Sequence, residues 1–313
     1  MKSRLTLLSL SFALAMLMGA CADTEFQPGV THDASPFGGF DFALSLDGQQ
    51  SCGEVIDLVF VLDVSSSMTR ILDTLEREID RVVTASNALA EDSRFGLVPF
   101  VDNHVIDATG PLEGGKVHIA AATLQAAFAN YRDIYTAYNI NPADGPTGPQ
   151  MQNPICEENA LDALYAAAEE FPWREGSTRV IIVATDDTFL ERPDNYGDKD
   201  GDGDTTDLFY PREGDYPALR TLAETKTLLR ANKIRVFSFS WPASAGLSTC
   251  GTGRRLPAAF AGAGWNMEYK GQSTLSDSTD GKDFDLTQIF GGQISLTETI
   301  NNVVLESRCN PIK

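Results

Sequence analysis

Residues 55–67 decide the fold, and they read Val55-Ile56-Asp57-Leu58-Val59-Phe60-Val61-Leu62-Asp63-Val64-Ser65-Ser66-Ser67. The first eight residues are apolar at all positions but one, which is typical of a strand buried on both faces of a parallel sheet. The run ends in an aspartate and three serines, directly before a stretch with helical spacing of apolar residues. The sequence therefore predicts a buried strand, a polar loop and a helix in direct succession.

Helical and strand patterns alternate along the rest of the chain. Apolar spacing predicts further strands at 94–101, 105–106, 179–185 and 234–240, with weak strand character at 267–269. It predicts helices at 68–90, 117–131, 158–171, 216–232, 255–263 and 286–306. Pro99 favours an edge or irregular position for its strand. The alternation predicts an α/β fold with a doubly wound, mainly parallel sheet flanked by helices, whose sites form beyond the carboxyl ends of the strands.

The first twenty residues have the features of an export signal. Lys2 and Arg4 precede an apolar run over 5–18, which is too short for a stable membrane span, and Gly19 and Ala20 follow. A plain secretory signal would explain this pattern. However, the Met-Gly-Ala-Cys sequence that ends at Cys21 resembles a lipobox, which implies a lipoprotein signal peptide over 1–20 and an acylated Cys21.

The resemblance to lipoproteins also implies a location. Ala22 follows the cysteine, and by known sorting rules this favours the outer membrane, with the protein facing the periplasm or the cell surface. Residues 21–50 are polar and rich in Gly and Pro, and we expect a flexible tether there. Residues 51–310 then form one domain, with loop insertions near 133–155, 187–215 and 241–285. The lipid anchor is the expected contact with the membrane.

Charge excludes one class of partner. The 313 residues carry 24 basic and 44 acidic side chains, a formal net charge of −20 at pH 7. Such a surface repels phosphate backbones, so nucleic-acid binding is not expected.

The cysteine count agrees with export. If Cys21 carries lipid, four cysteines remain, and an even number in an oxidising compartment suggests two disulfides with three pairings to choose from. Cys52 precedes the first predicted strand and Cys309 follows the last predicted helix. We therefore predict a Cys52–Cys309 bond that closes the domain, which leaves Cys156–Cys250 to join two loops.

Oxygen-bearing side chains gather where the first strand ends. Asp63, Ser65 and Ser67 are spaced by two, so an extended loop can present all three on one side. Their oxygens are hard ligands that suit Mg²⁺, Ca²⁺ or Mn²⁺. An alternative is that Asp or Ser simply caps the following helix, which needs no metal.

Two further segments extend this pattern. The strand at 179–185 ends in Asp186-Asp187, and the helix near 158 begins with Glu157-Glu158. Residues 63–67 resemble the DxSxS motif of the metal-ion-dependent adhesion site in von Willebrand factor A domains, and Thr185-Asp186 resembles its TD motif. Glu158 with the residues after it, and the strand at 94–102, are similar to integrin β subunits. The resemblance covers about residues 54–306 and implies Mg²⁺ (or Mn²⁺) bound by Asp63, Ser65, Ser67, Glu158 and Asp186.

The resemblance is incomplete around this site. Integrin β subunits use two aspartates soon after the serines for an adjacent metal, and this chain has Arg70 and Ile71 there. For a further metal of the family, Asp102 and Asn153 match two positions, whereas Ile155 replaces the third. We therefore expect the adjacent site to be lost and keep Asp102 and Asn153 as a candidate second metal site.

A separate acidic run could hold calcium. Acidic residues alternate with Lys or Gly from residue 198, as in calcium loops of the EF-hand kind, although Phe209 occupies the position of the usual glutamate. A solvated acidic loop is the alternative. The candidate ligands are Asp198, Asp200, Asp202, Asp204 and Asp207.

The resemblance implies a binding protein rather than an enzyme. We expect divalent-metal-dependent binding of a protein ligand that presents a carboxylate to the metal at the cell envelope. One alternative is a structural envelope module in which the metal only stabilises loops. A metal-dependent hydrolase is less favoured, since His32, His104 and His118 are the only histidines and none lies in a recognised base motif.

Overall fold

The computed structural model describes residues 52, 55–90, 92–144, 152, 157–192, 218–242, 248–249, 255–256, 262–310 and 312. Several predictions concern residues outside these ranges: the signal peptide, lipidated Cys21, the tether, Asn153, the Cys156–Cys250 bond and the acidic run at 198–207.

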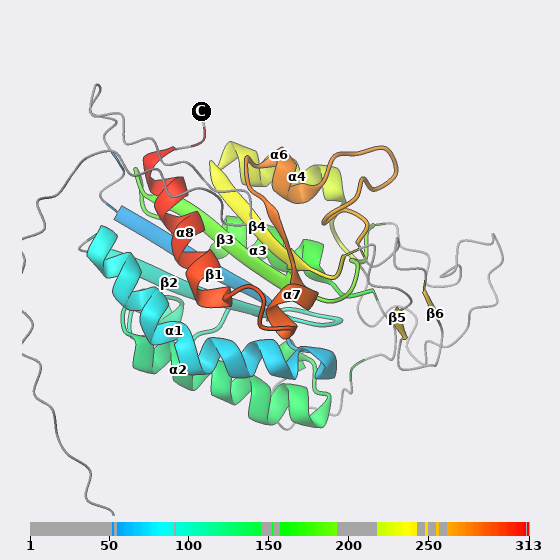
Figure 1. The fold of residues 1–313 in the computed structure, drawn as a ribbon, viewed down its shortest axis with the longest axis horizontal. Coiled ribbons are helices and arrows are strands. Elements are labelled where there is room, and N and C mark those ends of the chain that lie inside the picture. Colours follow the sequence, from blue (N-terminus) through cyan, green and yellow to red (C-terminus); the bar gives the residue numbers. More distant parts are fainter. Residues whose placement is uncertain are drawn as a thin grey trace, which may run out of the picture. The chain divides into compact units, whose positions relative to one another are not determined.

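A five-stranded parallel sheet forms the centre of the domain, in the order β2-β1-β3-β4-β7 (Figure 1). The strands are β1 (Val55–Asp63), β2 (Asp92–Phe100), β3 (Thr178–Thr185), β4 (Ile234–Ser240) and β7 (Asp283–Asp285). In register, Val61 lies between Val98 of β2 and Val183 of β3. The predicted doubly wound α/β fold is confirmed, and Pro99 lies in an edge strand as expected. A short antiparallel pair, β5 (Ser248–Thr249) and β6 (Arg255–Leu256), forms a second sheet.

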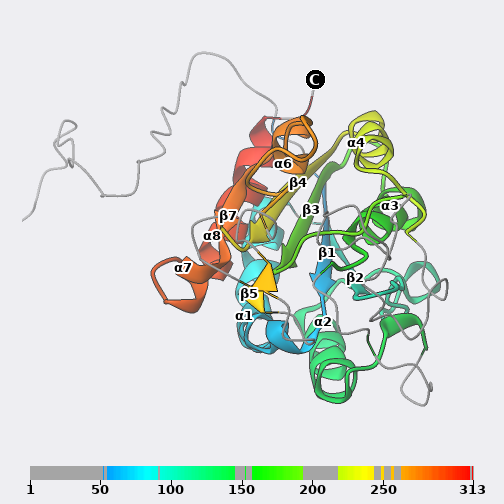
Figure 2. The same ribbon diagram turned by 90° about the vertical axis from the view of Figure 1, so that its right-hand side faces the viewer.

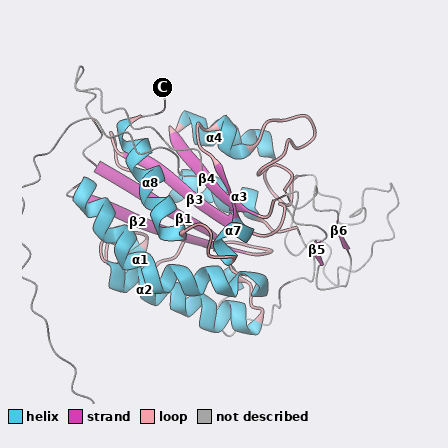
Figure 3. Cartoon of the chain, in the orientation of Figure 1, coloured by secondary structure: helices cyan, strands magenta, loops and turns pink. Residues whose placement is uncertain are grey.

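Helices cover both faces of the sheet, as Figure 2 shows from the side. One layer contains α1 (Thr69–Leu89), α2 (Ala121–Asn130), α7 (Leu286–Phe290) and α8 (Leu296–Cys309). The other contains α3 (Ala160–Glu170), α4 (Leu222–Ala231) and α6 (Leu275–Ser278). Short helical turns occur at η1 (Ser66–Met68), η2 (Glu113–Gly115), η3 (Tyr131–Thr136) and η4 (Pro142–Asp144). Figure 3 shows the helices, strands and loops of these layers by colour.

The sequence of β1 explains why two layers form. Side chains of a strand alternate between the faces of a sheet. Phe60 therefore belongs to the core under α1 and α8, whereas Val59 and Val61 belong to the core under α3 and α4. On α1, the buried residues repeat every three or four positions, which gives that helix one apolar face toward the sheet. Because β1 is apolar on both faces, a layer of helices must cover each face of the sheet.

Several predicted elements differ from the structure. Residues 105–106 form no regular strand, although Val105 N and Asp107 N donate to carbonyl oxygens of β2. Residues 255–256 are a strand rather than the start of a helix, and the last strand of the sheet is β7 rather than 267–269. The expected loop from 133 onward begins inside the π-helical turn η3.

Helix ends were also predicted imperfectly. The last helix is two helices, because Gly291 and Gly292 follow α7 and the Ser295 side chain then caps α8. Thr221 and Glu224 cap each other's backbone at the start of α4, which begins that helix at Leu222 instead of 216. In the same way, Val117 and His118 lie in extended backbone that bridges to other residues, so α2 begins only at Ala121.

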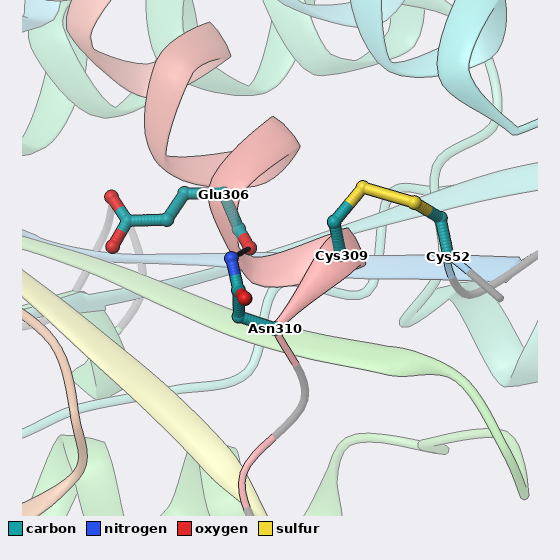
Figure 4. The surroundings of a disulfide bond; sticks show 4 residues. All are labelled: Cys52, Glu306, Cys309 and Asn310. Carbon is teal, nitrogen blue, oxygen red and sulfur yellow. Dashed lines mark hydrogen bonds between the residues drawn. A yellow bond between two sulfur atoms is a disulfide. The ribbon is translucent and has the colours of Figure 1, made fainter. Parts of the chain in front are cut away.

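A disulfide joins the two ends of the domain. Cys52, just before β1, is bonded to Cys309, the last residue of α8, with a Cα–Cα distance of 4.2 Å (Figure 4). Next to it, the Asn310 side-chain amide donates to the Glu306 carbonyl oxygen and ends the helix. No helix in the described ranges combines the length and apolarity needed to cross a membrane.

Candidate metal centre

The carboxyl ends of β1 and β3 bring two acidic segments together. The strands are paired up to Leu62 and Ala184, so the residues that follow them leave the sheet side by side. Asp63 is fully buried at the end of β1, and the Val64 amide donates to the Phe100 carbonyl oxygen of β2 at 3.0 Å. The position of the candidate site therefore follows from strand order, as expected for a parallel sheet.

Hydrogen bonds connect the two segments. The Ser65 amide donates to Asp63 Oδ1 at 2.7 Å, and the Thr185 hydroxyl donates to Asp63 Oδ2 at 2.8 Å. The Ser67 hydroxyl donates to Asp186 Oδ1 at 2.9 Å and lies 3.0 Å from the Ser65 hydroxyl. The structure thus brings Asp63, Ser65, Ser67 and Asp186 together.

Helix capping does not account for these side chains. Ser65 precedes η1 and Met68 precedes α1, and neither residue makes a side-chain capping hydrogen bond. The hydroxyls of Ser65 and Ser67 instead point toward each other and, through Ser67, toward Asp186. The hydrogen bonds expected if these side chains only capped a helix are therefore absent at Ser65 and Met68.

Three carboxylates converge here. One oxygen each of Asp63, Asp186 and Asp187 lies within 4.8 Å of the others, a spacing that one cation could bridge. Within the described ranges, none of the three forms an ion pair with Lys or Arg. Buried carboxylates are normally paired with a cation or coordinate a metal.

Glu158 is a further carboxylate near this cluster, and it is buried like Asp63. Its backbone is fixed beside the segment after β3, since its amide donates to the Thr188 carbonyl oxygen at 3.0 Å and its own carbonyl accepts from the Leu190 amide at 2.9 Å. The side chain is 3% exposed, and Oε2 is buried without a hydrogen-bond donor. An acceptor oxygen in this position is available to a cation.

Burial raises the pKa values of all four acids, and the charges of neighbouring carboxylates add to the rise for Asp63, Glu158 and Asp187. Burial, and then the Asp186 charge, raise the pKa of Asp63 from 3.8 to about 7, against hydrogen bonds that lower it. Burial is also the main reason why the pKa of Asp186 is raised and why those of Glu158 and Asp187 are raised well above their ordinary values. Oxygen donors with this much uncompensated negative charge fit a hard divalent cation.

The candidate second metal site has a protein partner for Asp102. This buried carboxylate accepts from the Asn141 side-chain amide at 2.7 Å, and the Asp102 amide donates to Asn141 Oδ1 at 3.2 Å. The charge of Asp102 also raises the pKa of Glu158, so the two carboxylates are near each other. Asn153 lies outside the described residues, so a metal bound by Asp102 and Asn153 stays a prediction.

At the position of the adjacent metal site of integrin β subunits, this chain has an arginine. Arg70, which stands where integrin β subunits have an aspartate, places its guanidinium 5.5 Å from the centre of the Phe290 ring at the end of α7. A fixed positive charge with an aromatic partner is a poor metal ligand. The loss of this site stays a prediction.

Two residues contribute to the site without having been predicted as ligands. Asp187 was not among the predicted ligands, because the TD motif that the chain resembles ends at Asp186; in the structure both acids share the cluster. The hydroxyl of Thr185 holds Asp63 and also accepts from the Asp187 amide at 3.1 Å. Two consecutive aspartates directly after a buried strand were the sequence feature that could have indicated Asp187.

Comparison with known proteins gives one recurring similarity. The chain is 29% identical to integrin beta-2 of Sus scrofa over 191 residues, which are 55% of this chain and 24% of that protein. It is 27% identical to integrin beta-2 of Ovis canadensis over 201 residues, which are 58% of this chain and 25% of that protein. No family model matches the chain. The chain thus spans about a quarter of the length of these relatives, and its similarity to integrin beta-2 is weak and partial.

Solved structures of low sequence identity are also similar. An aerotolerance-related membrane protein from Bacteroides fragilis has 13% identity and a TM-score of 0.42, covering 81% of this chain and 98% of its own. Proximal thread matrix protein 1 from the mussel byssus has 14% identity and a TM-score of 0.42, covering 82% and 46%.

Proposed function

We propose that the protein binds a protein ligand through a divalent cation held at the carboxyl edge of its sheet. The observation that carries this proposal is the convergence of the buried Asp63 with the partly exposed Asp186 and Asp187, none of which pairs with Lys or Arg in the described part of the chain. The partial similarity to integrin beta-2 supports the same assignment.

The cation would be held by Asp63, Ser65, Ser67, Glu158 and Asp186, with Asp187 beside them. When bound, Mg²⁺ or Mn²⁺ supplies a coordination position that a ligand carboxylate can occupy in place of water. The residues of this chain fix the donors. Thr185 orients Asp63 through a 2.8 Å hydrogen bond, and Ser67 orients Asp186 through one of 2.9 Å. No enzymatic step forms part of the proposal.

The proposed place of action is the cell envelope. The sequence around Cys21 supports a lipid anchor in the outer membrane, and the Cys52–Cys309 bond agrees with an oxidising compartment. In this arrangement the carboxylate-bearing partner is a protein of the envelope or of a neighbouring cell surface.

The first test is binding of the metal alone. Isothermal titration of the metal-free protein with Mn²⁺ should give one saturable site in the wild type and none in Asp63→Asn. Asp57→Asn is the matched control, because it makes the same substitution in the same strand, at the end where Arg174 binds the carboxylate. Equal Mn²⁺ binding by all three proteins would contradict the proposal.

The second test concerns the ligand. Wild type and Asp63→Asn are used as bait for envelope extracts, each in Mg²⁺ and in EDTA, and the captured proteins are identified and purified. The proposal expects a partner that binds directly only to the wild type with Mg²⁺. A different result would favour the alternative function. If a partner is captured in all four conditions and metal only raises the melting temperature, the protein is a structural module in which the metal stabilises loops.

His118 gives little support to a hydrolase. His118 is fully buried and lies between Asp107 and Thr123, 2.9 Å from the former and 3.0 Å from the latter, so its ring nitrogens are both occupied. Turnover of ester, phosphoester or peptide substrates that is lost in Asp63→Asn would reverse this conclusion.

A further inference from the structure

One peptide group of the metal loop, which is the segment of residues 63–67, is held from a distant part of the chain. The carbonyl of Val64 and the amide of Ser65 belong to the same planar peptide group. Its amide donates to Asp63 Oδ1 at 2.7 Å, and its carbonyl oxygen accepts from the Thr136 hydroxyl at 2.9 Å. Because the group is planar, the donor on the carbonyl side also sets the direction of the amide that holds Asp63.

Thr136 provides the shorter of two contacts to this carbonyl. The Gln152 side-chain amide lies 3.4 Å from the Val64 carbonyl oxygen and 3.3 Å from that of Ile140, so its hydrogen bonding is divided. Thr136 is 2% exposed, and its hydroxyl has a single proton, which it donates to Val64. The position of this peptide group therefore depends mainly on the position of Thr136.

A π-helical turn brings Thr136 to this place. α2 continues beyond Asn130 into η3 (Tyr131–Thr136), whose hydrogen bonds join residues five apart instead of four. In a continuous α-helix of 3.6 residues per turn, Thr136 would face about 140° away from Tyr131. The wider turn brings residues five apart toward one side, and both Tyr131 and Thr136 are buried.

The start of this turn is anchored at the edge of the sheet. The Tyr131 hydroxyl donates to Asp107 Oδ1 at 3.2 Å. The other carboxylate oxygen of Asp107 accepts from the Thr109 hydroxyl at 2.7 Å and lies 2.9 Å from His118 Nε2. The Asp107 amide donates to the Leu97 carbonyl oxygen of β2 at 2.9 Å. Asp107 is thus fixed to the edge strand, and it fixes Tyr131 in turn.

We propose that η3 positions the metal loop, with Thr136 as a positioning residue that acts through the Val64–Ser65 peptide and Tyr131 as the anchor that sets the place of Thr136. The consequence for the cation rests on the proposed function. Its affinity is then controlled from the side of the domain formed by α2 and the edge of β2, by residues that do not touch the cation.

The first measurement follows the metal loop without metal. Hydrogen exchange of the Ser65 amide, observed by NMR of the full chain in EDTA, reports the hydrogen bond to Asp63. Exchange should be about tenfold faster in Thr136→Val and in Tyr131→Phe, and about as slow as in the wild type in Thr136→Ser, which keeps the hydroxyl.

Thr225→Val is the matched control. It also removes a buried threonine hydroxyl that donates to a backbone carbonyl oxygen, at 3.0 Å, but in α4 on the other face of the sheet. Exchange of the Ser65 amide should change about twofold or less in this variant. Circular dichroism and the melting temperature verify that each variant is folded. If Thr136→Val does not fold, Tyr131→Phe tests the same connection.

The second measurement is the affinity for Mn²⁺ by calorimetry. Thr136→Val should weaken binding about tenfold, as changes beside metal ligands commonly do, whereas Thr136→Ser and Thr225→Val should change it about twofold or less. Tyr131→Phe should also weaken binding. The double variant Tyr131→Phe with Thr136→Val should lose no more than Thr136→Val alone, because Tyr131 acts through Thr136.

Two outcomes would overturn the proposal. Losses that multiply in the double variant would mean that Tyr131 and Thr136 act independently. Unchanged exchange of the Ser65 amide in Thr136→Val and Tyr131→Phe would mean that η3 does not hold the loop. If the wild type binds no Mn²⁺, the proposed function fails, and the exchange rates in EDTA still decide whether Thr136 positions the metal loop.

Discussion

Replacing Asp63 by Asn should change stability in opposite directions with and without metal. In EDTA the buried carboxylate costs free energy, because burial and Asp186 raise its pKa from 3.8 to about 7. A shift of about 3 units at about 1.4 kcal/mol per unit makes ionisation of Asp63 cost roughly 4 kcal/mol in the folded state near neutral pH. The amide removes that cost.

The expected gain is smaller than this cost, because the amide keeps only part of the hydrogen bonding. Its oxygen can still accept from the Ser65 amide, whereas the bond from the Thr185 hydroxyl is lost or reversed, at about 1 kcal/mol. Metal-free Asp63→Asn should therefore unfold with a free energy about 1–3 kcal/mol higher than the wild type.

Metal should reverse the order. A cation at one hundred times its Kd stabilises the wild type by about 2.7 kcal/mol, and the variant should gain almost nothing. The assay is urea unfolding followed by circular dichroism, near neutral pH, in EDTA and in saturating Mn²⁺. The control Asp57→Asn removes a charge that Arg174 binds with two side-chain nitrogens, so it should lose about 1–3 kcal/mol in both conditions.

Two results would refute the reasoning. One is an Asp63→Asn protein that is less stable than the wild type in EDTA, since burial next to Asp186 would then not make the Asp63 charge costly. The other is an equal gain from Mn²⁺ in the wild type and in Asp63→Asn, since the cation would then bind elsewhere.

Three further predictions concern the domain as a whole. Cys52→Ser should lower the free energy of unfolding by about 2–5 kcal/mol, because the Cys52–Cys309 bond closes a long loop; a melting temperature unaffected by the substitution or by reductant would contradict this. Burial raises the pKa of Asp283 to about 6, so its contribution to stability is complete below 3.8 and is lost as pH rises through about 6; Asp283→Asn should show a shallower decline over that window in pH-dependent urea unfolding, and an unchanged slope would count against it. Gly96→Ala should cost about 1–3 kcal/mol, because a Cβ there would meet the Phe171 ring at 2.5 Å, and chemical denaturation that shows no loss would mean that the ring moves freely.

The parts of the fold that sequence predicted well are those with a strong apolar pattern. The strands β1, β3 and β4 are apolar on both faces and were located within a residue or two. Since parallel strands end at one edge, the meeting of Asp63 with Asp186 followed from their positions alone.

The missed elements carry weak local signals. β7 reads Asp-Phe-Asp, and it is held by tertiary contacts, since the Ser238 and Ser240 hydroxyls both donate to Asp283. No apolar periodicity marks such a strand. The Gly291-Gly292 pair was a visible breaker inside the predicted final helix, and Gly292 adopts a φ of +68° that continues no helix. Apolar spacing on both sides concealed the interruption.

The position of β1 determines how the domain would carry tension. The chain enters at Cys52 and reaches Asp63 along a single strand, so an anchor before Cys52 and a ligand near Asp63 would pull on opposite ends of β1. That strand is hydrogen-bonded lengthwise to β2 and β3 on both sides, and it must slide past both before it can leave the sheet. The Cys52–Cys309 bond shares the load with α8 at the anchored end. If the proposed anchor and ligand both act on the domain, this arrangement of β1 would oppose unfolding under tension.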